Sequence, residues 1–222
     1  MKLACIKAQR DMSSVNLIAV SKTHSSDLIY DLFKLGQRDF GENYVQEALQ
    51  KIDSLNGHKL NWHFIGNLQS NKVKKVVGKF KMIHSVASFE LAEHISKCAV
   101  EKNLAQEVLF EINLGNEIAK KGFSLNNFEE YFPKIIQLPN IVCKGLMALP
   151  PIGEHAESVR PYLHTLKNFF SQMKEIIPAD KKIDWQHLSM GTTTDFEIAI
   201  EEGATFVRIG TAIFGERKKE SL

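Results

Sequence analysis

The sequence predicts an α/β protein that folds as a single (β/α)8 barrel of the TIM type. Eight short apolar runs alternate with helical segments along the 222-residue chain, and no composition break interrupts the series. Strands that alternate with helices pair in parallel through right-handed crossovers, and eight such units close a barrel. The alternative is an open doubly wound sheet, whose dinucleotide-binding form usually carries a GxGxxG loop after its first strand. No such loop is present, which favours the closed barrel.

The first strand and helix show the pattern that then repeats. Residues 17–20 are a short apolar run, typical of a strand that is covered on both faces. Ser25 or Ser26 can cap the helix that follows, and Asp27 is favoured in its first turn. Apolar residues then recur at helical spacing until Gly36, which ends the helix.

The same reasoning places the remaining elements. Apolar runs predict further strands at 38–43, 62–67, 81–86, 108–115, 141–149, 185–191 and 204–210. Helical spacing of apolar residues predicts helices at 44–52, 70–78, 88–99, 125–132, from about 161 to 173, and at 195–202. Ser88 is suited to open the helix at 88–99, and Gly78 to end the helix at 70–78.

The bulk properties describe one domain. We expect a short N-terminal segment at 1–15, the barrel at about 16–215 and a polar tail at 216–222, within one domain over 1–222. The length and the 44% hydrophobic content suffice for one substantial core. The net charge of +2, from 28 basic and 26 acidic residues, provides no field that would concentrate nucleic acid or an anionic membrane.

Cysteine usage and the N-terminus indicate a cytoplasmic protein. The first residues are too polar for a signal peptide, and no run of eighteen apolar residues occurs. Cys5, Cys98 and Cys143 are scattered, which suggests a reducing compartment and neither a disulfide framework nor a zinc site. The eight histidines show no metal-ligand spacing. We expect a monomer without a bound metal.

Lys22 is the first candidate site residue. Side chains alternate along a strand, so Lys22 lies on the same face as Ile18 and Val20. The commoner role of such a lysine is to extend its head into water. Desolvation on an inward face would instead favour the neutral amine, a nucleophile toward aldehydes. Barrel sites lie at the C-terminal ends of the strands, where Lys22 stands, and this favours the second role.

The loops after the seventh and eighth strands are suited to a phosphate. Thr194 and Glu197 have capping-box spacing, which predicts a helix N-terminus whose free N–H groups favour an anion. The hydroxyl of Thr193 can add a hydrogen bond, although an ordinary threonine-rich cap is the alternative. In this barrel type both loops frequently hold phosphate, and the second offers Gly210 and Thr211.

Arg208 shares its strand face with Phe206. A surface ion pair with Glu201 or Glu202 would be its ordinary role. Its functional role would be to donate toward a phosphate or a ring nitrogen. An arginine that faces a pyridine nitrogen disfavours protonation of that nitrogen, because two positive charges would then be adjacent.

Six motifs in chain order resemble those of the pyridoxal-phosphate homeostasis protein family. They are AVSKTH, FGENYVQE, WHFIGNLQSNK, NEIAKKG, GLMALPP and SMGTTTDFEIAIEEGATFVRIGTAIFG, and the resemblance covers residues 16–215. It implies a barrel similar to the N-terminal domain of alanine racemase, of the fold type III that binds pyridoxal 5'-phosphate, without that enzyme's C-terminal β domain. It also implies that the cofactor is held as a Schiff base.

The resemblance assigns roles by matching position. The implied cofactor-binding residues are Lys22, which forms the Schiff base, Asn43 near the ring, Arg208 at the ring nitrogen, and Thr193, Gly210 and Thr211 at the phosphate. The chain departs from the family pattern at GTTTD, where Thr192 replaces methionine and Thr193 replaces serine. Threonine keeps the hydroxyl, so we expect phosphate binding to survive; the role of Thr192 stays open.

Three functions fit these residues. The first is a homeostasis protein that holds pyridoxal phosphate, limits the free aldehyde and delivers it to apo-enzymes. The second is a racemase or decarboxylase with the same cofactor, but racemases of this type take a catalytic tyrosine from a C-terminal domain for which we expect no room after Gly215. The third is an aldolase-type barrel that uses Lys22 on a sugar phosphate. We favour the first, with no catalytic residues.

Overall fold

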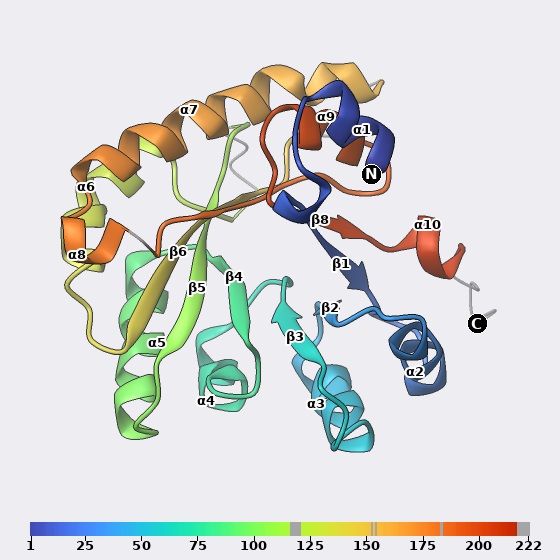
Figure 1. The fold of residues 1–222 in the computed structure, drawn as a ribbon. Helices are drawn as coiled ribbons and strands as arrows, with labels where there is room; N and C mark the ends of the chain where they lie inside the picture. Colours follow the sequence, from blue (N-terminus) through green and yellow to red (C-terminus); the bar gives the residue numbers. More distant parts are fainter. Residues whose placement is uncertain (116–120, 152, 154, 183, 217–222) are drawn as a thin grey trace.

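Eight parallel strands form a closed barrel in the computed structural model, which describes residues 1–222 except 116–120, 152, 154, 183 and 217–222 (Figure 1). The strands are β1 (Asn16–Val20), β2 (Asp39–Glu42), β3 (Asn61–Phe64), β4 (Met82–Val86), β5 (Gln106–Ile112), β6 (Ile141–Ala148), β7 (His187–Ser189) and β8 (Phe206–Ile209). Their spatial order is their chain order, and β8 pairs with β1. The predicted (β/α)8 barrel is confirmed.

Helices follow the strands and cover the outside of the barrel (Figure 1). The α-helices are α1 (Lys2–Lys7), α2 (Ser26–Lys34), α3 (Val45–Ser54), α4 (Val73–Val76), α5 (Phe89–Glu101), α6 (Leu125–Ile135), α7 (Arg160–Ile176), α8 (Ala179–Lys182), α9 (Phe196–Glu201) and α10 (Thr211–Phe214). Short 3-10 helices occur at η1 (Met12–Ser14), η2 (Ser70–Lys72) and η3 (Ala156–Val159). No helix in the described ranges is long and apolar enough to cross a membrane.

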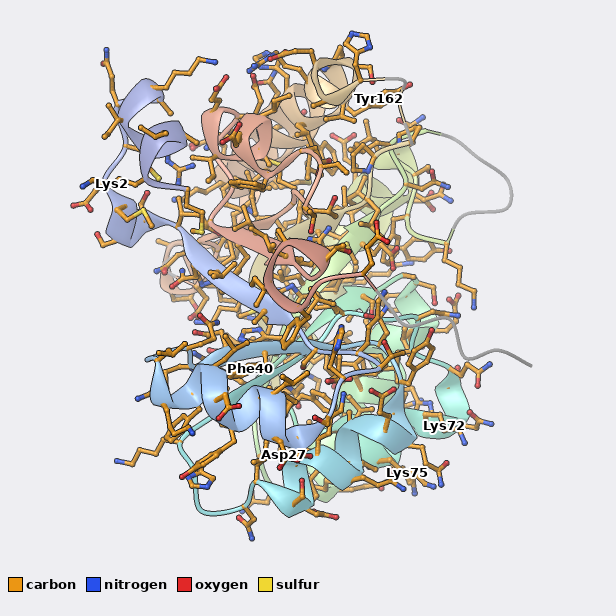
Figure 2. The ribbon with its side chains drawn as sticks, turned by 90° about the vertical axis from the view of Figure 1, so that its right-hand side faces the viewer. Lys2, Asp27, Phe40, Lys72, Lys75 and Tyr162 are labelled. Carbon is orange, nitrogen blue, oxygen red and sulfur yellow. The ribbon has the colours of Figure 1, made fainter. Side chains whose placement is uncertain are left out.

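Two separate hydrophobic clusters fill the molecule. A large one lies mainly between the barrel and its helices, and it includes Phe40, Phe110 and Trp185, all fully buried. A small one comprises Ile18, Met82, Leu109, Met147 and Phe206, which occupy inward-facing strand positions. In the view of Figure 2, Phe40 lies within the molecule and Lys2 and Lys75 lie at its periphery.

The strand register fixes which side chains share the barrel interior. Ile18 of β1 lies opposite Arg208 of β8, so the arginine belongs to the inward face. Val20, two residues after Ile18, lies opposite Gly41 of β2. Because side chains alternate along a strand, Lys22 follows these residues toward the C-terminal mouth of the barrel.

The helix predictions are confirmed in outline, with two differences. The single helix expected at 70–78 is divided into η2 and α4, and Gly78 follows with a φ of +79°. Several short elements were not predicted, among them α1, which packs against α9 beside the barrel (Figure 1). Most of the NEIAKKG motif and nearly all of the predicted tail at 216–222 lie outside the described residues.

Candidate functional site

A cavity of about 300 Å³ lies at the C-terminal ends of the strands, a size at the lower limit of ordinary ligand pockets. All six residues that the sequence singled out line it: Lys22, Asn43, Thr193, Arg208, Gly210 and Thr211. They come from the ends of β1, β2, β7 and β8. Loops at this end of a barrel bring together residues that are far apart in the sequence, which is why the positions converge.

The backbone beside Lys22 is held in an unusual conformation. Thr23 has a φ of +67°, which is rare for a β-branched residue. Its N–H donates to Glu47 Oε1 of α3 at 2.5 Å, and the N–H of His24 donates to the carbonyl of Ser21 at 3.1 Å. These bonds oppose the strain of the left-handed residue and define the direction in which Lys22 leaves the strand.

A buried ion pair supports the same segment from below. Lys51 Nζ donates to Glu42 Oε1 at 2.8 Å, to Glu47 Oε1 at 2.5 Å and to the carbonyl of Ser21 at 2.7 Å. Ser21 Oγ also donates to Glu42 Oε1 at 2.6 Å. Burial raises the pKa of Glu42, although the hydrogen bonds from Lys51 and Ser21 oppose that shift. The residues on both sides of Lys22 are therefore anchored to one buried cation.

The threonine loop differs from the predicted capping box. Thr194 is not the cap of α9, whose N-cap is Asp195 without a side-chain hydrogen bond. Instead, the Asp195 carboxylate accepts from the N–H of Thr192 at 2.6 Å and from its hydroxyl at 2.8 Å. The prediction of a Thr194–Glu197 box is therefore wrong. Thr192, whose role the sequence left open, binds the Asp195 carboxylate and so fixes the loop.

This arrangement leaves donors at the mouth of the barrel. The carbonyl of Thr192 accepts from the N–H groups of Asp195 and Phe196, so the intervening residues form the first turn of the helical segment. Among the described residues, no hydrogen bond uses the N–H groups of Thr193 or Thr194, as expected for a first turn. Both residues line the cavity, so an anion there would find unpaired donors.

The second loop closes the cavity from the β8 side. Gly210 is the N-cap of α10, and its carbonyl accepts from the N–H groups of Ile213 and Phe214. Phe214 stacks on His24 with ring centroids 4.5 Å apart. This stack ties the loop after β8 to the loop after β1, so that Thr211 and Lys22 belong to one wall of the site.

Arg208 is buried beneath the cavity and is only 5% exposed. It donates through Nη1 to Ser189 Oγ at 2.6 Å and through Nη2 to the carbonyl of Ala148 at 2.9 Å. Burial lowers the pKa of Arg208 to about 10, against the effect of the nearby Asp195 and Glu111 charges, so it stays charged at neutral pH.

The alternative of a surface ion pair for Arg208 is wrong. Glu201 and Glu202 accept from Arg160 of α7 instead, at 2.7 and 2.8 Å. Glu201 also pairs with Lys7 of α1 at 2.7 Å.

Asn43 contributes a buried acceptor. Its Oδ1 has no hydrogen-bond partner among the described residues. The side of the site where it stands is tightly packed, because a Cβ on Gly66 would lie 2.2 Å from the carbonyl oxygen of Asn43. A buried acceptor without a donor is costly, which indicates that a ligand or solvent group supplies the donor.

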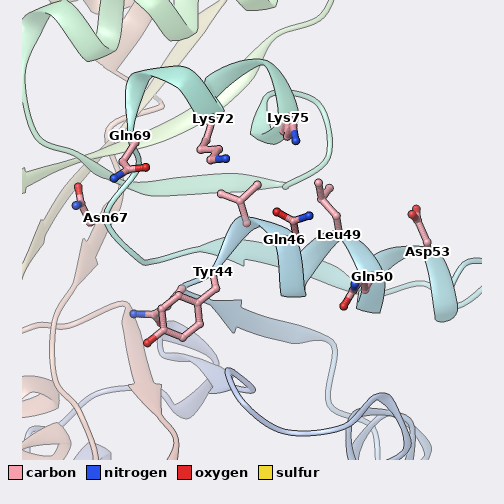
Figure 3. A pocket seen from close by; sticks show the side chains of 11 residues that line it. Tyr44, Gln46, Leu49, Gln50, Asp53, Asn67, Gln69, Lys72 and Lys75 are labelled. Atoms are coloured by element: carbon pink, nitrogen blue, oxygen red, sulfur yellow. The ribbon is translucent and has the colours of Figure 1, made fainter.

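A larger groove of about 650 Å³ lies next to the cavity, and Asn43 lines both. Gln46 and Leu49 of α3 face Lys72 and Lys75 of the η2–α4 segment across it (Figure 3). It is lined by amides and lysines together with Tyr44, Val45, Leu49 and Asp53, and it lies between α3 and the η2–α4 segment. We place the site in the smaller cavity, because Lys22 and the buried Arg208 converge there.

Sequence reasoning missed the residues that support the site. Ser21, Glu42 and Lys51 anchor the Lys22 segment, and Ser189 binds Arg208. The available signals were weak: a polar residue at an inward strand position, as for Ser189, or a lysine within the buried face of α3, as for Lys51. Neither pattern reveals its partner.

Comparison with known proteins agrees with this architecture. The model of the alanine racemase N-terminal domain matches residues 4–218. The pyridoxal phosphate homeostasis protein of Aquifex aeolicus (strain VF5) is 44% identical over 97% of this chain and 92% of its own length. That of Pseudomonas aeruginosa is 39% identical over 95% of this chain and 88% of its own length.

The chain belongs to the pyridoxal phosphate homeostasis protein family.

A solved structure of another relative supports the same family assignment. PipY of Synechococcus elongatus PCC7942, solved with pyridoxal phosphate bound, is 35% identical and superposes with a TM-score of 0.84. The match covers 96% of this chain and 98% of that one. The family expected from the six sequence motifs is thereby confirmed.

Proposed function

We propose that this protein binds pyridoxal 5'-phosphate through a covalent link to Lys22 and serves in intracellular cofactor homeostasis. The observation that carries the proposal is the cavity in which Lys22 meets two donor-rich loops and a buried arginine. Pyridoxal phosphate supplies an aldehyde, which condenses with a primary amine and releases water. An absorption band of the imine in the visible or near ultraviolet that the protein keeps after free cofactor is removed tests this, and it separates the proposal from an aldolase that binds a sugar phosphate.

The donors in the cavity fit the cofactor group by group. Thr193 with its free N–H, and Gly210 with Thr211 on the facing loop, suit the phosphate. Arg208 suits the ring nitrogen, and its positive charge would keep that nitrogen unprotonated. The buried Oδ1 of Asn43 suits a hydroxyl donor on the ring.

Thr193→Ala should weaken the binding of pyridoxal phosphate far more than that of unphosphorylated pyridoxal. A lost hydrogen bond to a charged group is worth about 1.5–3 kcal/mol, or about a tenfold to hundredfold change in affinity. Thr193→Ser, which keeps the hydroxyl, is the control and should bind nearly as wild type. Titration by absorbance with both ligands measures the effect. Equal weakening of the two ligands would remove Thr193 from the phosphate site.

We further propose that the protein holds the cofactor without turning over amino acids. Among the described residues that line the cavity, Lys22 and Arg208 are the ionisable ones. Racemisation needs a second proton-transfer group on the opposite face of the substrate, and the loss of a general acid or base typically costs about 10²–10⁴ in rate. An amino acid could still displace Lys22, which would release the cofactor for delivery to an apo-enzyme.

Incubation of the loaded protein with L- and D-amino acids should give no conversion at an enzymatic rate. Chiral chromatography follows the enantiomer ratio, and release of carbon dioxide reports decarboxylation. Lys22→Ala protein with the same cofactor serves as the background. Turnover in the usual range of about 1–10³ per second that disappears in Lys22→Ala would make the protein an enzyme.

A further inference from the structure

A chain of hydrogen bonds runs through the barrel interior from Arg208 to the opposite end. Arg208 Nη1 lies 2.6 Å from Ser189 Oγ, which lies 2.9 Å from His84 Nδ1. His84 Nε2 lies 2.9 Å from His63 Nδ1, and His63 Nε2 lies 3.0 Å from Asp39 Oδ1. These residues come from β8, β7, β4, β3 and β2. The chain joins the floor of the site to the N-terminal end of β2.

The two ends of the chain fix the direction of every bond in it. Arginine can only donate, and an ionised carboxylate can only accept. A neutral His63 must therefore carry its proton on Nε2 toward Asp39, which leaves its Nδ1 to accept from His84 Nε2. The Nδ1 of His84 then accepts from the hydroxyl of Ser189, whose oxygen is left to accept from Arg208. With both histidines neutral, a single arrangement of protons satisfies all four bonds.

The surroundings of the chain keep this arrangement. Burial lowers the pKa of both histidines, most strongly for His84, which also lies near the charged guanidinium of Arg208. Burial alone would raise the pKa of Asp39. The hydrogen bonds from His63 and Asn61 and the nearby charge of Lys81 outweigh burial, so the pKa is lowered. Polar groups in a low-dielectric interior stay in place only when every one of them is paired, so the chain resists rearrangement.

We propose that Ser189, His84 and His63 are positioning residues that hold the Arg208 guanidinium toward the cofactor ring through this one-way chain, anchored at Asp39. This proposal rests on the proposed function, in which Arg208 faces the ring nitrogen of the cofactor. The interior of such a barrel is usually filled by branched apolar side chains. Here it also contains hydrogen-bond acceptors that fix the Arg208 guanidinium.

The first test uses the cofactor-free protein and ¹⁵N NMR of histidine side chains. His63 and His84 should each carry a single proton, on Nε2, at neutral pH. A proton on Nδ1 of either residue, or two protons on either ring, would overturn the one-way chain. This outcome is independent of whether pyridoxal phosphate binds.

The second test uses Ser189→Ala, loaded with pyridoxal phosphate that is ¹⁵N-labelled in its ring. Loss of the acceptor should move the ring-nitrogen resonance and weaken cofactor binding about twofold to tenfold. The control is Ser96→Ala, which removes an equally buried hydroxyl that donates to the Pro139 carbonyl outside the barrel interior. The control should leave the resonance unchanged even if it lowers the melting temperature.

The outcomes separate the two proposals. A wild-type protein that binds the cofactor, with an unchanged ring-nitrogen resonance in Ser189→Ala, would overturn the positioning role and leave the proposed function intact. A wild-type protein that forms no covalent link to pyridoxal phosphate would overturn the proposed function, and the histidine protonation would still decide whether the one-way chain exists.

Discussion

Lys22→Ala should abolish the absorption band that pyridoxal phosphate gives on binding. Lys22 is the primary amine in the cavity that the threonine loop, Thr211 and Arg208 share, so its removal leaves no nucleophile there. In the wild-type protein, borohydride should reduce the Schiff base and leave a stable adduct on the peptide that contains Lys22. Peptide mapping by mass spectrometry after reduction provides the measurement.

Lys75→Ala is the matched control for this experiment. Lys75 is an exposed lysine that lines the neighbouring groove but not the cavity, so its variant should keep the band and the adduct. The truncated Lys22 side chain also removes little packing, because Lys22 is partly exposed. An adduct found chiefly on another lysine, or an undiminished band in Lys22→Ala, would contradict the assignment.

Lys51→Met should destabilise the fold by about 3–5 kcal/mol. Glu42 is fully buried and Lys51 is 5% exposed, so removal of the lysine leaves an uncompensated carboxylate in the interior. Urea unfolding at neutral pH, followed by circular dichroism, measures the loss. The control is Lys34→Met, which breaks an ion pair of similar length, 2.7 Å to Asp31, whose partners are both more than half exposed. That variant should stay within about 1 kcal/mol of wild type.

The deficit of Lys51→Met should depend on pH. Without its cation, Glu42 keeps the burial that raises its pKa and loses the partner that opposed the rise. The folded state then binds a proton more strongly than the unfolded chain, whose carboxyl titrates near about 4.3. Stability conferred by that proton is lost as pH rises through the folded pKa, so the deficit should be smaller near about pH 5 than near about pH 8. A deficit that grows on acidification would contradict the role of Glu42.

The sequence predicted the parts of the fold that follow from periodicity. Several strands, such as β1 and β4, are short apolar runs, and three helices begin after a capping serine, among them α2, which lies between Ser25 and Gly36. Closure of the barrel followed from the number of units. The convergence of Lys22, Thr193 and Arg208 then followed from the rule that the C-terminal strand ends meet at one mouth.

The features that the sequence did not predict depend on partners far apart in the chain. Asp195 reaches back to Thr192, where a local pattern suggested Thr194 and Glu197. The GTTTD sequence is compatible with either set of hydrogen bonds, and the position of the loop against the barrel decides which one forms. In the same way, nothing near His84 reveals that Ser189, 105 residues later, supplies its hydrogen bond. Such contacts are set by strand register, which periodicity alone does not fix.

The pairing of β1 with β8 has a consequence for the biosynthesis of the protein. Thr211 leaves the ribosome 189 positions after Lys22 (211 minus 22). At translation rates of about 5–20 residues per second, the interval is about 10–40 seconds. Throughout that time the lysine stands in an unfinished barrel without the wall formed by the last strand and its loop. If the finished barrel holds the cofactor as proposed, a nascent or truncated chain that lacks β8 and its loop should not retain it, so capture of the cofactor should follow the synthesis of the last strand.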